Sequence, residues 1–190
     1  MALDVAALRQ QFPMLQRRVG GKPIHYLDSA NTSQKPVCVI DAMSRFMREG
    51  YGPIGRSSYT LASEASDAYE GARAKVARFI NARSPREVVF TKNATESLNL
   101  AAQSWGRANL GKGDAVVLTH MEHHANIVPW QMLAAEKGFE IRWVPLTPDF
   151  RLDLASLDSL LRGAKAFALD RKSTRLNSSH TDISRMPSSA

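Results

Sequence analysis

The stretch that decides the fold runs from residue 115 to residue 144 and reads AVVLTHMEHHANIVPWQMLAAEKGFEIRWV. Residues 115–119 are apolar or β-branched, a pattern that predicts a buried strand. The stretch then predicts a helix from about residue 125 to residue 136 and a second strand from 139 to 144. Two strands joined by a helix of this length predict a βαβ unit, in which the strands lie parallel.

The same alternation continues on both sides of this stretch. Upstream, the residues predict a strand at 87–91 and a helix from about 95 to 105. Downstream, they predict a helix at 154–161 and a strand at 165–169. We therefore expect an α/β fold with a mostly parallel sheet and flanking helices, forming one partial domain over residues 1–168.

The first third of the chain predicts helices separated by turns. Asp4 suits the cap of a short first helix, and residues 24–27 read as a strand. A second helix is expected from Pro36 through Glu49. Residues 51–62 read as a loop, after which Ser63 suits the cap of a third helix.

Composition describes a soluble globular protein and excludes several classes. The chain has 190 residues, 44% of them hydrophobic and 23% charged, with a net charge of +7. Four basic residues and one acid in the segment 171–190 account for +3 of that charge. The remaining basic residues are scattered among acids, whereas a nucleic-acid footprint needs a basic stripe with aromatics, so we expect no nucleic-acid partner.

Nothing in the sequence indicates export or a membrane. No apolar run approaches the roughly 18 residues that suggest a transmembrane helix. The N-terminal residues MALDVAALRQ lack the basic and apolar regions of a signal peptide, so a cytoplasmic protein is expected. The single cysteine, Cys38, lies on the apolar side of an expected helix and is interpreted as a buried structural cysteine.

The C-terminal segment differs from the rest of the chain. Residues 171–190, RKSTRLNSSHTDISRMPSSA, have little apolar periodicity and many serines. One interpretation is a flexible tail. The one we prefer is a translated stretch of sequencing-adapter DNA joined to an interrupted reading frame, which makes residues 169–190 a non-native tail.

Three polar segments, each expected between a strand and a helix, could carry chemistry. In Thr91–Ser97, TKNATES, backbone amides and the Thr95 hydroxyl at a helix start suit a phosphate, although a simple helix cap by Asn93 or Thr95 is the alternative. The segment Thr119–Asn126, THMEHHAN, allows loop histidines, a ring-stacking or proton-handling histidine, or a metal. DSANTSQKP at 28–36 reads either as a turn or as a substrate-side loop.

A metal is the weakest interpretation of the histidine segment. Its order does not match the two histidines that flank a glutamate at helical spacing in zinc proteases. His123 and His124 are adjacent, so they would diverge in most backbones. We therefore expect no metal on His120, Glu122 and His123.

Taken together, these segments resemble a known family. In chain order they are YLDSANTSQKP, SYTLASEA, FINARSPREVVFTKNATESLNL, SWGRANL and MEHHANIVPWQ. The chain over residues 10–168 resembles the group II, Suf-type cysteine desulfurases of the class V aminotransferase family. The resemblance implies a fold-type I pyridoxal 5'-phosphate enzyme, usually a homodimer. It also implies release of sulfur from L-cysteine as a persulfide for an acceptor protein and iron–sulfur cluster assembly, with alanine as product.

The resemblance assigns roles to five residues. It places Ala94 and Thr95 at the cofactor phosphate, His123 against the pyridine ring, and Ala30 and Asn31 on the loop beside the substrate. Three positions depart from the family pattern. The family commonly has a small apolar residue at Asn31 and often a threonine at Ala94, and a histidine-containing loop stands where this chain has Gly55–Tyr59, GRSSY.

The resemblance also places the catalytic groups elsewhere. The acidic partner of the pyridine nitrogen, the Schiff-base lysine and the sulfur-accepting cysteine follow later strands, beyond residue 168. Lys165 and Lys172 lack the expected context, and Cys38 comes too early. We therefore assign no catalytic residue and expect the fragment to be inactive. The alternatives are a selenocysteine lyase or another class V enzyme and, in a different class, a small anion-binding module.

Overall fold

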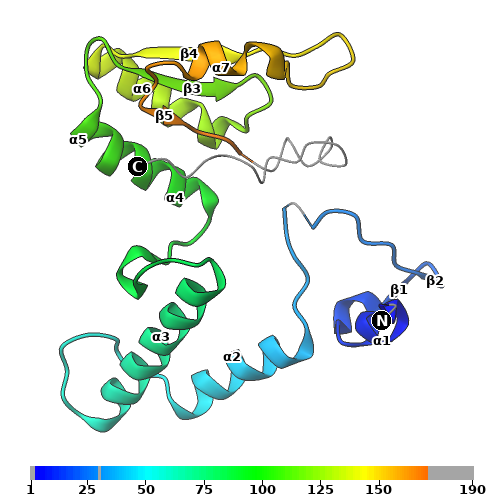
Figure 1. Ribbon diagram of the computed structural model, residues 1–190. Coiled ribbons are helices and arrows are strands. Elements are labelled where there is room, and N and C mark those ends of the chain that lie inside the picture. The colour runs from blue at the N-terminus through cyan, green and yellow to red at the C-terminus, as the bar shows by residue number, and fades with distance from the viewer. Residues whose placement is uncertain (1–2, 30, 171–190) are drawn as a thin grey trace. The chain divides into compact units, whose positions relative to one another are not determined.

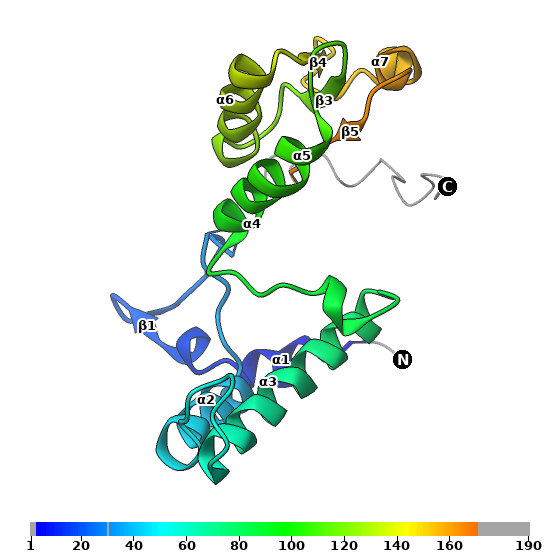
Figure 2. The ribbon, with the colours of Figure 1, turned by 90° about the vertical axis from the view of Figure 1, so that its left-hand side faces the viewer.

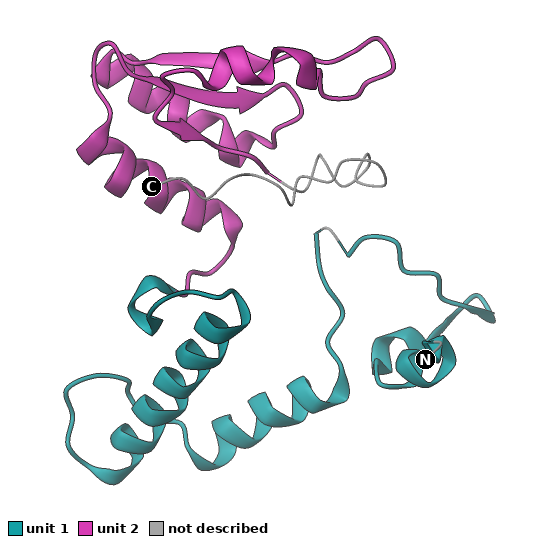
Figure 3. Ribbon diagram, viewed as in Figure 1, with its two compact units in different colours: residues 1–89 teal, residues 90–190 magenta. Residues whose placement is uncertain are grey.

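The structure is a computed structural model that describes residues 3–29 and 31–170 (Figure 1). It divides into two compact units, unit 1 over residues 1–89 and unit 2 over residues 90–190 (Figure 3). Ala30 lies outside the described residues. So does the interpreted non-native tail from residue 171 onward.

Unit 1 is built from three helices and short connecting elements. Asp4 caps the first helix as expected, because its Oδ1 accepts a hydrogen bond from the Ala7 amide at 3.0 Å. Two short strands form an antiparallel hairpin after it. The elements in chain order are α1 Val5–Gln10, η1 Pro13–Gln16, β1 Arg18–Val19, β2 Lys22–Pro23, α2 Val37–Glu49, α3 Thr60–Phe79 and η2 Pro85–Glu87.

The strand predicted at residues 24–27 and the helix cap predicted at Ser63 are both wrong. Residues 24–27 form no strand. The Ile24 carbonyl accepts a hydrogen bond from Arg9 Nη2 at 2.6 Å instead of joining a ladder. Ser63 does not cap α3, which begins at Thr60 after the extended residue Tyr59.

The expected burial of Cys38 is also wrong. Its helix, α2, has an apolar side, yet none of its residues is buried and Cys38 is exposed. Helical periodicity predicted the apolar side correctly, but only a second packed element buries such a side. In α3 the buried residues are the alanines Ala62, Ala65 and Ala77.

Unit 2 is an α/β layer structure around a three-stranded parallel sheet. The strands are β3 Ala115–Thr119, β4 Glu140–Val144 and β5 Ala166–Phe167, in the order β4-β3-β5. The α/β fold with a parallel sheet is therefore confirmed. The prediction for β3 matches residue for residue, whereas β5 is shorter than the expected strand 165–169.

Helices cover both faces of this sheet. Figure 2 shows α6 on one side of the strands and α7 on the other. Residues 94–109 form one helical stretch with a π-helical segment in its middle. The elements are α4 Ala94–Ala101, η3 Ala102–Gly106, α5 Arg107–Asn109, η4 His124–Asn126, α6 Val128–Lys137, η5 Leu154–Ser156 and α7 Leu157–Leu161.

The core of unit 2 lies between the sheet and the helices on the α6 side. Val116 and Leu118 point into it from β3, and Trp130 and Leu133 from α6. The core is completed by Ala102, Leu110 and Phe139. Gly106 lies so close to α6 that an added Cβ would stand 2.9 Å from Leu133 Cδ2.

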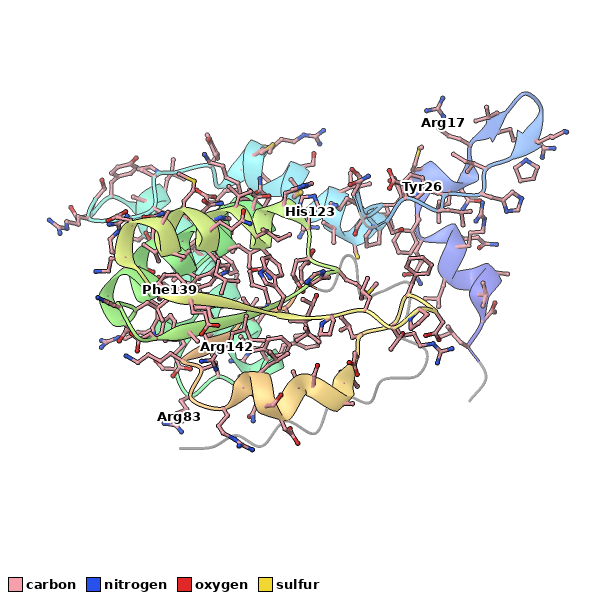
Figure 4. All side chains as sticks on the ribbon, turned by 90° about the horizontal axis from the view of Figure 1, so that it is seen from above. Arg17, Tyr26, Arg83, His123, Phe139 and Arg142 are labelled. Carbon is pink, nitrogen blue, oxygen red and sulfur yellow. The ribbon has the colours of Figure 1, made fainter. Side chains whose placement is uncertain are left out.

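The opposite face of the sheet is tied to α7 by an arginine. Arg142 is the register partner of Val117 in β3. Its Nη1 donates to the carbonyls of Leu160 at 3.2 Å and Arg162 at 2.8 Å, which satisfies backbone acceptors at the end of α7. Figure 4 labels Arg142 and Phe139 near β4.

The prediction of a strand at 87–91 is wrong. Residues 85–87 form η2, and residues 88–91 form no strand. The Val88 carbonyl accepts a hydrogen bond from Arg73 Nε at 3.2 Å, which ties it to α3 instead of to a sheet. Among residues 3–29 and 31–170, no helix has the length and apolar character needed to cross a membrane.

Candidate functional site

The candidate site is formed by two segments of unit 2. The first is the start of α4, and the second is the loop of residues 119–126 that follows β3. Helix α4 contacts η4, the short helix that ends this loop, so the two motifs lie on neighbouring elements. The second motif lies beyond the carboxyl end of a parallel strand, where ligands bind in open α/β sheets.

The start of α4 is fixed by two reciprocal side-chain hydrogen bonds. Asn93 Oδ1 accepts from the Glu96 amide at 2.9 Å, and Glu96 Oε2 accepts from the Lys92 amide at 2.6 Å. This arrangement resembles a capping box and confirms that Asn93 caps the helix. The helix therefore begins at Ala94.

Ala94 and Thr95 present donors at this helix start. Both residues are exposed, and among the described residues neither backbone amide has an acceptor. The positive end of the helix macrodipole lies at the same point. Two free amides, the Thr95 hydroxyl and a helix N-terminus form a donor set whose chemistry fits a phosphate.

The loop after β3 is held by a buried polar network. Glu122 Oε1 accepts from the Thr119 hydroxyl at 2.6 Å, and Glu122 Oε2 accepts from Asn126 Nδ2 at 2.8 Å. Asn126 Oδ1 accepts in turn from the indole N–H of Trp130 at 3.2 Å. All four residues are buried, and every polar side-chain atom buried in the described residues has a partner.

His123 lies in the chain between the buried residues Glu122 and Asn126, and its own side chain is exposed. Its Nδ1 accepts a hydrogen bond from the Ala125 amide at 3.1 Å, which makes His123 the cap of η4 (Figure 4). An Nδ1 that accepts this bond carries no proton, so the neutral ring carries its proton on Nε2. The imidazole face and Nε2 are therefore the parts available to a ligand.

His120, Glu122 and His123, the three residues considered as metal ligands, each interact with a different partner. Glu122 is taken up by the buried network, and His123 Nδ1 by Ala125. The ring of His120 packs edge-on against Trp143, with 5.4 Å between the ring centroids. Across the described part of the chain, no group of three or more His, Cys, Asp or Glu side chains is arranged to hold a metal ion.

The substrate-side loop belongs to unit 1. Asn31 closes a turn, because its amide donates to the Asp28 carbonyl at 3.2 Å and its Nδ2 to Asp28 Oδ1 at 3.0 Å. The segment 28–36 therefore begins with a turn, as one of its two interpretations predicts, and the substrate-side interpretation stays a prediction. The structure brings Ala94, Thr95 and His123 onto contacting elements of unit 2, whereas Asn31 lies in the other unit.

Sequence reasoning did not predict the network behind the histidine loop. Glu122 was weighed only as a metal ligand, and Asn126 and Trp130 were given no role. Asn126 and Trp130 are four residues apart, a spacing that places two side chains on one helical face. Glu122 precedes the short helix η4, so its part in the network depends on the fold.

Comparisons with known proteins show what this chain is similar to. The model of the aminotransferase class-V family matches residues 25–174. The chain is 49% identical over 177 residues to a cysteine desulfurase from Serratia proteamaculans (strain 568), covering 93% of this chain and 44% of that protein. It is 50% identical over 160 residues to a cysteine desulfurase from Salmonella newport (strain SL254), covering 84% and 39% respectively. The chain thus spans less than half the length of these relatives.

Solved structures give the same result for the fold. The apo structure of a cysteine desulfurase from Thermococcus onnurineus NA1 matches with a TM-score of 0.78 and 32% identity, covering 89% of this chain and 40% of that one. The cysteine desulfurase CsdA from Escherichia coli, in an S-sulfonic acid form, matches with a TM-score of 0.69 and 34% identity, covering 88% and 41%.

Proposed function

Because this chain belongs to the aminotransferase class-V family, we propose that it is the amino-terminal part of a pyridoxal-phosphate-dependent cysteine desulfurase. One observation carries the proposal. The free amides of Ala94 and Thr95 and the exposed ring of His123 lie on contacting elements, in a chain 49% identical to a cysteine desulfurase. Such a pair of features fits a cofactor that carries both a phosphate and an aromatic ring.

Each site residue has a defined part in holding the cofactor. Ala94 and Thr95 would donate their amides, and Thr95 its hydroxyl, to the phosphate at the positive end of α4. His123 would offer its ring face to the pyridine ring. When bound, pyridoxal phosphate supplies an electron sink for bond breaking at the amino-acid substrate.

The substrate side of the proposal comes from the resemblance, which assigns Ala30 and Asn31 to the substrate loop. Ala30 and Asn31 would lie beside L-cysteine, and the turn that Asn31 makes with Asp28 would fix the backbone there. Asn31 adds an amide where the family commonly has a small apolar group, so we expect this position to influence substrate choice. The Gly55–Tyr59 loop is the second place where substrate contacts would differ.

The finer parts of the proposal come from the sequence resemblance. They are the Suf-type subgroup, a homodimer, alanine as product, and transfer of persulfide sulfur to an acceptor protein for iron–sulfur cluster assembly. The stretch MEHHANIVPWQ supports the subgroup. It carries the cofactor-stacking histidine together with Asn126 and Trp130, which hold the loop.

We also propose that residues 1–190 alone are inactive. The chain has one cysteine, Cys38, and it lies in α2. Lys165 donates a hydrogen bond to the Asn109 carbonyl and forms an ion pair with Asp114. Its ammonium group is therefore engaged in contacts next to the sheet. These residues do not supply the lysine that holds the cofactor or the thiolate that accepts sulfur.

The test joins residues 1–168 to the remaining part of the Serratia relative and compares this chimera with the 190-residue chain. We expect the chimera to acquire visible cofactor absorbance and to form alanine from L-cysteine, and the short chain to form none. A matched pair probes the phosphate site: Thr95→Val is expected to weaken cofactor affinity about tenfold, whereas Thr95→Ser retains the hydroxyl and the affinity.

The other outcomes separate the competing functions. Alanine formed from L-selenocysteine but not from L-cysteine would indicate a lyase of the same fold. Turnover by the short chain would contradict its proposed inactivity. A folded chimera that carries the cofactor and forms no alanine from either amino acid would contradict the desulfurase assignment.

A further inference from the structure

The most informative group outside the proposed cofactor contacts is the Glu122 carboxylate. Its residue is only 8% exposed, and burying a carboxylate is costly unless hydrogen bonds compensate. Three donors compensate here: the Thr119 hydroxyl, Asn126 Nδ2 and the backbone amide of Asp170. A carboxylate engaged by three donors is placed to hold structure in position rather than to react.

These three donors come from three different segments of unit 2. Thr119 is the last residue of β3, Asn126 ends η4 just before α6, and Asp170 follows β5. Glu122 therefore connects the carboxyl ends of the two neighbouring strands β3 and β5 to the start of α6. The contact at residue 170 uses the backbone, so it does not depend on which side chain stands there.

The position of His123 follows from this connection. Residues 119–126 form an arch: Glu122 and Asn126 turn inward and bind each other, and His123 and His124 between them are exposed. Within the arch, Nδ1 of His123 is occupied by the Ala125 amide, and the ring is exposed. Loss of the inward anchor would release the arch, and with it the orientation of the ring.

We propose that Glu122 is a positioning residue, which orients His123 toward the cofactor by anchoring the 119–126 arch to the ends of β3 and β5. This inference rests on the proposed function for the identity of the ligand. It gives Glu122 a part in cofactor affinity without contact with the cofactor. The arch itself is a property of the chain and is measurable without any ligand.

The test compares two substitutions in the 190-residue chain. Glu122→Leu removes all three acceptor contacts at similar volume. Glu122→Gln keeps a carbonyl oxygen for Asn126 and Asp170, and the Thr119 hydroxyl, which is both donor and acceptor, rotates to accept from the new amide. Leu110→Ala, in the core before the start of β3 and outside residues 119–126, is the control for general loss of stability.

The first readout is the arch. We expect Glu122→Leu to raise the local hydrogen exchange of the Ala125 amide at least tenfold and to mix the two ring tautomers of His123, as seen by ¹⁵N NMR of labelled histidine. Glu122→Gln is expected to restore the wild-type values. Leu110→Ala is expected to leave both signals unchanged. An unchanged Ala125 amide and His123 tautomer in Glu122→Leu would overturn the proposal.

The second readout is the affinity for pyridoxal phosphate, measured by titration with His123→Ala as reference. We expect Glu122→Leu to weaken binding about tenfold, close to the effect of His123→Ala, and Glu122→Gln to weaken it less than twofold. Weaker binding in His123→Ala but not in Glu122→Leu would overturn the positioning role and leave the proposed function standing. Unchanged binding in His123→Ala would contradict the proposed function, whereas the arch readout still decides the role of Glu122.

Discussion

Asn126 Nδ2 donates a hydrogen bond of 2.8 Å to Glu122 Oε2 inside unit 2, where Asn126 is fully buried. The amide cannot be reversed without cost, because Asn126 Oδ1 simultaneously accepts from the Trp130 indole at 3.2 Å. The orientation of the Asn126 amide is therefore fixed, with its NH2 group toward Glu122 and its oxygen toward Trp130. A substitution that changes a donor into an acceptor at this position tests the network directly.

Asn126→Asp is expected to make the stability of unit 2 depend on pH. Two carboxylates would face each other in a buried site, so the folded state raises the pKa of the pair. Stability is then greatest below about pH 4, where the pair is protonated in both states, and falls as the pH rises. We expect a loss of roughly 2–4 kcal/mol at pH 7 relative to the wild type.

Urea unfolding followed by tryptophan fluorescence measures this effect, because all three tryptophans lie in unit 2. Gln131→Glu, the corresponding amide-to-carboxylate change at an exposed position of α6, is the control and should stay within about 0.5 kcal/mol of the wild type. A loss that is equal at pH 5 and pH 8 would show that the two carboxylates do not face each other.

Gly106→Ala is expected to destabilise unit 2 by about 1–3 kcal/mol. An added Cβ would stand 2.9 Å from Leu133 Cδ2 and 3.0 Å from Trp130 Cζ3. Both side chains are buried in the core and have little room to move. The measurement is urea unfolding by tryptophan fluorescence.

The matched control is Gly71→Ala in α3, where an added Cβ meets nothing within 4 Å. Circular dichroism should show this helix to be stabilised by about 0.5–1 kcal/mol, since alanine is the better helix former. If Gly106→Ala were equally stabilising, the close approach between η3 and α6 would be contradicted.

Arg142→Met should loosen the end of α7. The substitution removes the donors to the Leu160 and Arg162 carbonyls, and we expect a cost of about 1–2 kcal/mol and faster amide exchange in α7. Glu140→Gln separates this effect from the ion pair, because it weakens the contact with Glu140 and keeps the carbonyl contacts. It should cost no more than about 0.5 kcal/mol, as exposed pairs do.

The pair of Asp114 and Lys165 is expected to stabilise the sheet in a pH-dependent way. The hydrogen bond from Lys165, followed by that from the Gly111 amide, lowers the pKa of Asp114. A lowered carboxyl pKa gives stability that is present above the unfolded value of about 4 and is lost as the pH falls through the lower folded value.

A double-mutant cycle of Asp114→Asn and Lys165→Met measures this contribution by urea unfolding at several pH values. The coupling between the two residues should be present at pH 7 and should disappear below the pKa of Asp114 in the folded state. Coupling that persists at pH 2 would show that charge on Asp114 is not its source.

Residues 115–119 show why part of the fold was predictable. They are apolar or β-branched throughout, a pattern that predicts a buried strand, and they form a strand that is fully buried. The cap at Asn93 is similar, because Asn93 and Glu96 interact within one helical turn. Local chemistry of this kind does not depend on the rest of the chain.

Residues 87–91 and Cys38 show where local patterns fail. A β-branched run becomes a strand only where another strand accepts its hydrogen bonds, and the Val88 carbonyl is taken by Arg73 instead. An apolar helix side predicts burial only where another element covers it, which is not so at Cys38 in α2. Both outcomes depend on residues distant in the sequence.

The sequence alone therefore determined the parallel α/β architecture, a helix start near residue 95 and the resemblance that points to a cofactor phosphate and ring. Each follows from a pattern that can be read along the chain: apolar runs alternating with helical periodicity, a capping residue before a helix, and the order of the motifs. The tertiary structure decided that Glu122 is buried, that its partners are Thr119, Asn126 and the Asp170 amide, and that His123 faces outward. The physical reason is that a buried carboxylate takes its donors from wherever the fold brings them, here from as far as 48 residues away.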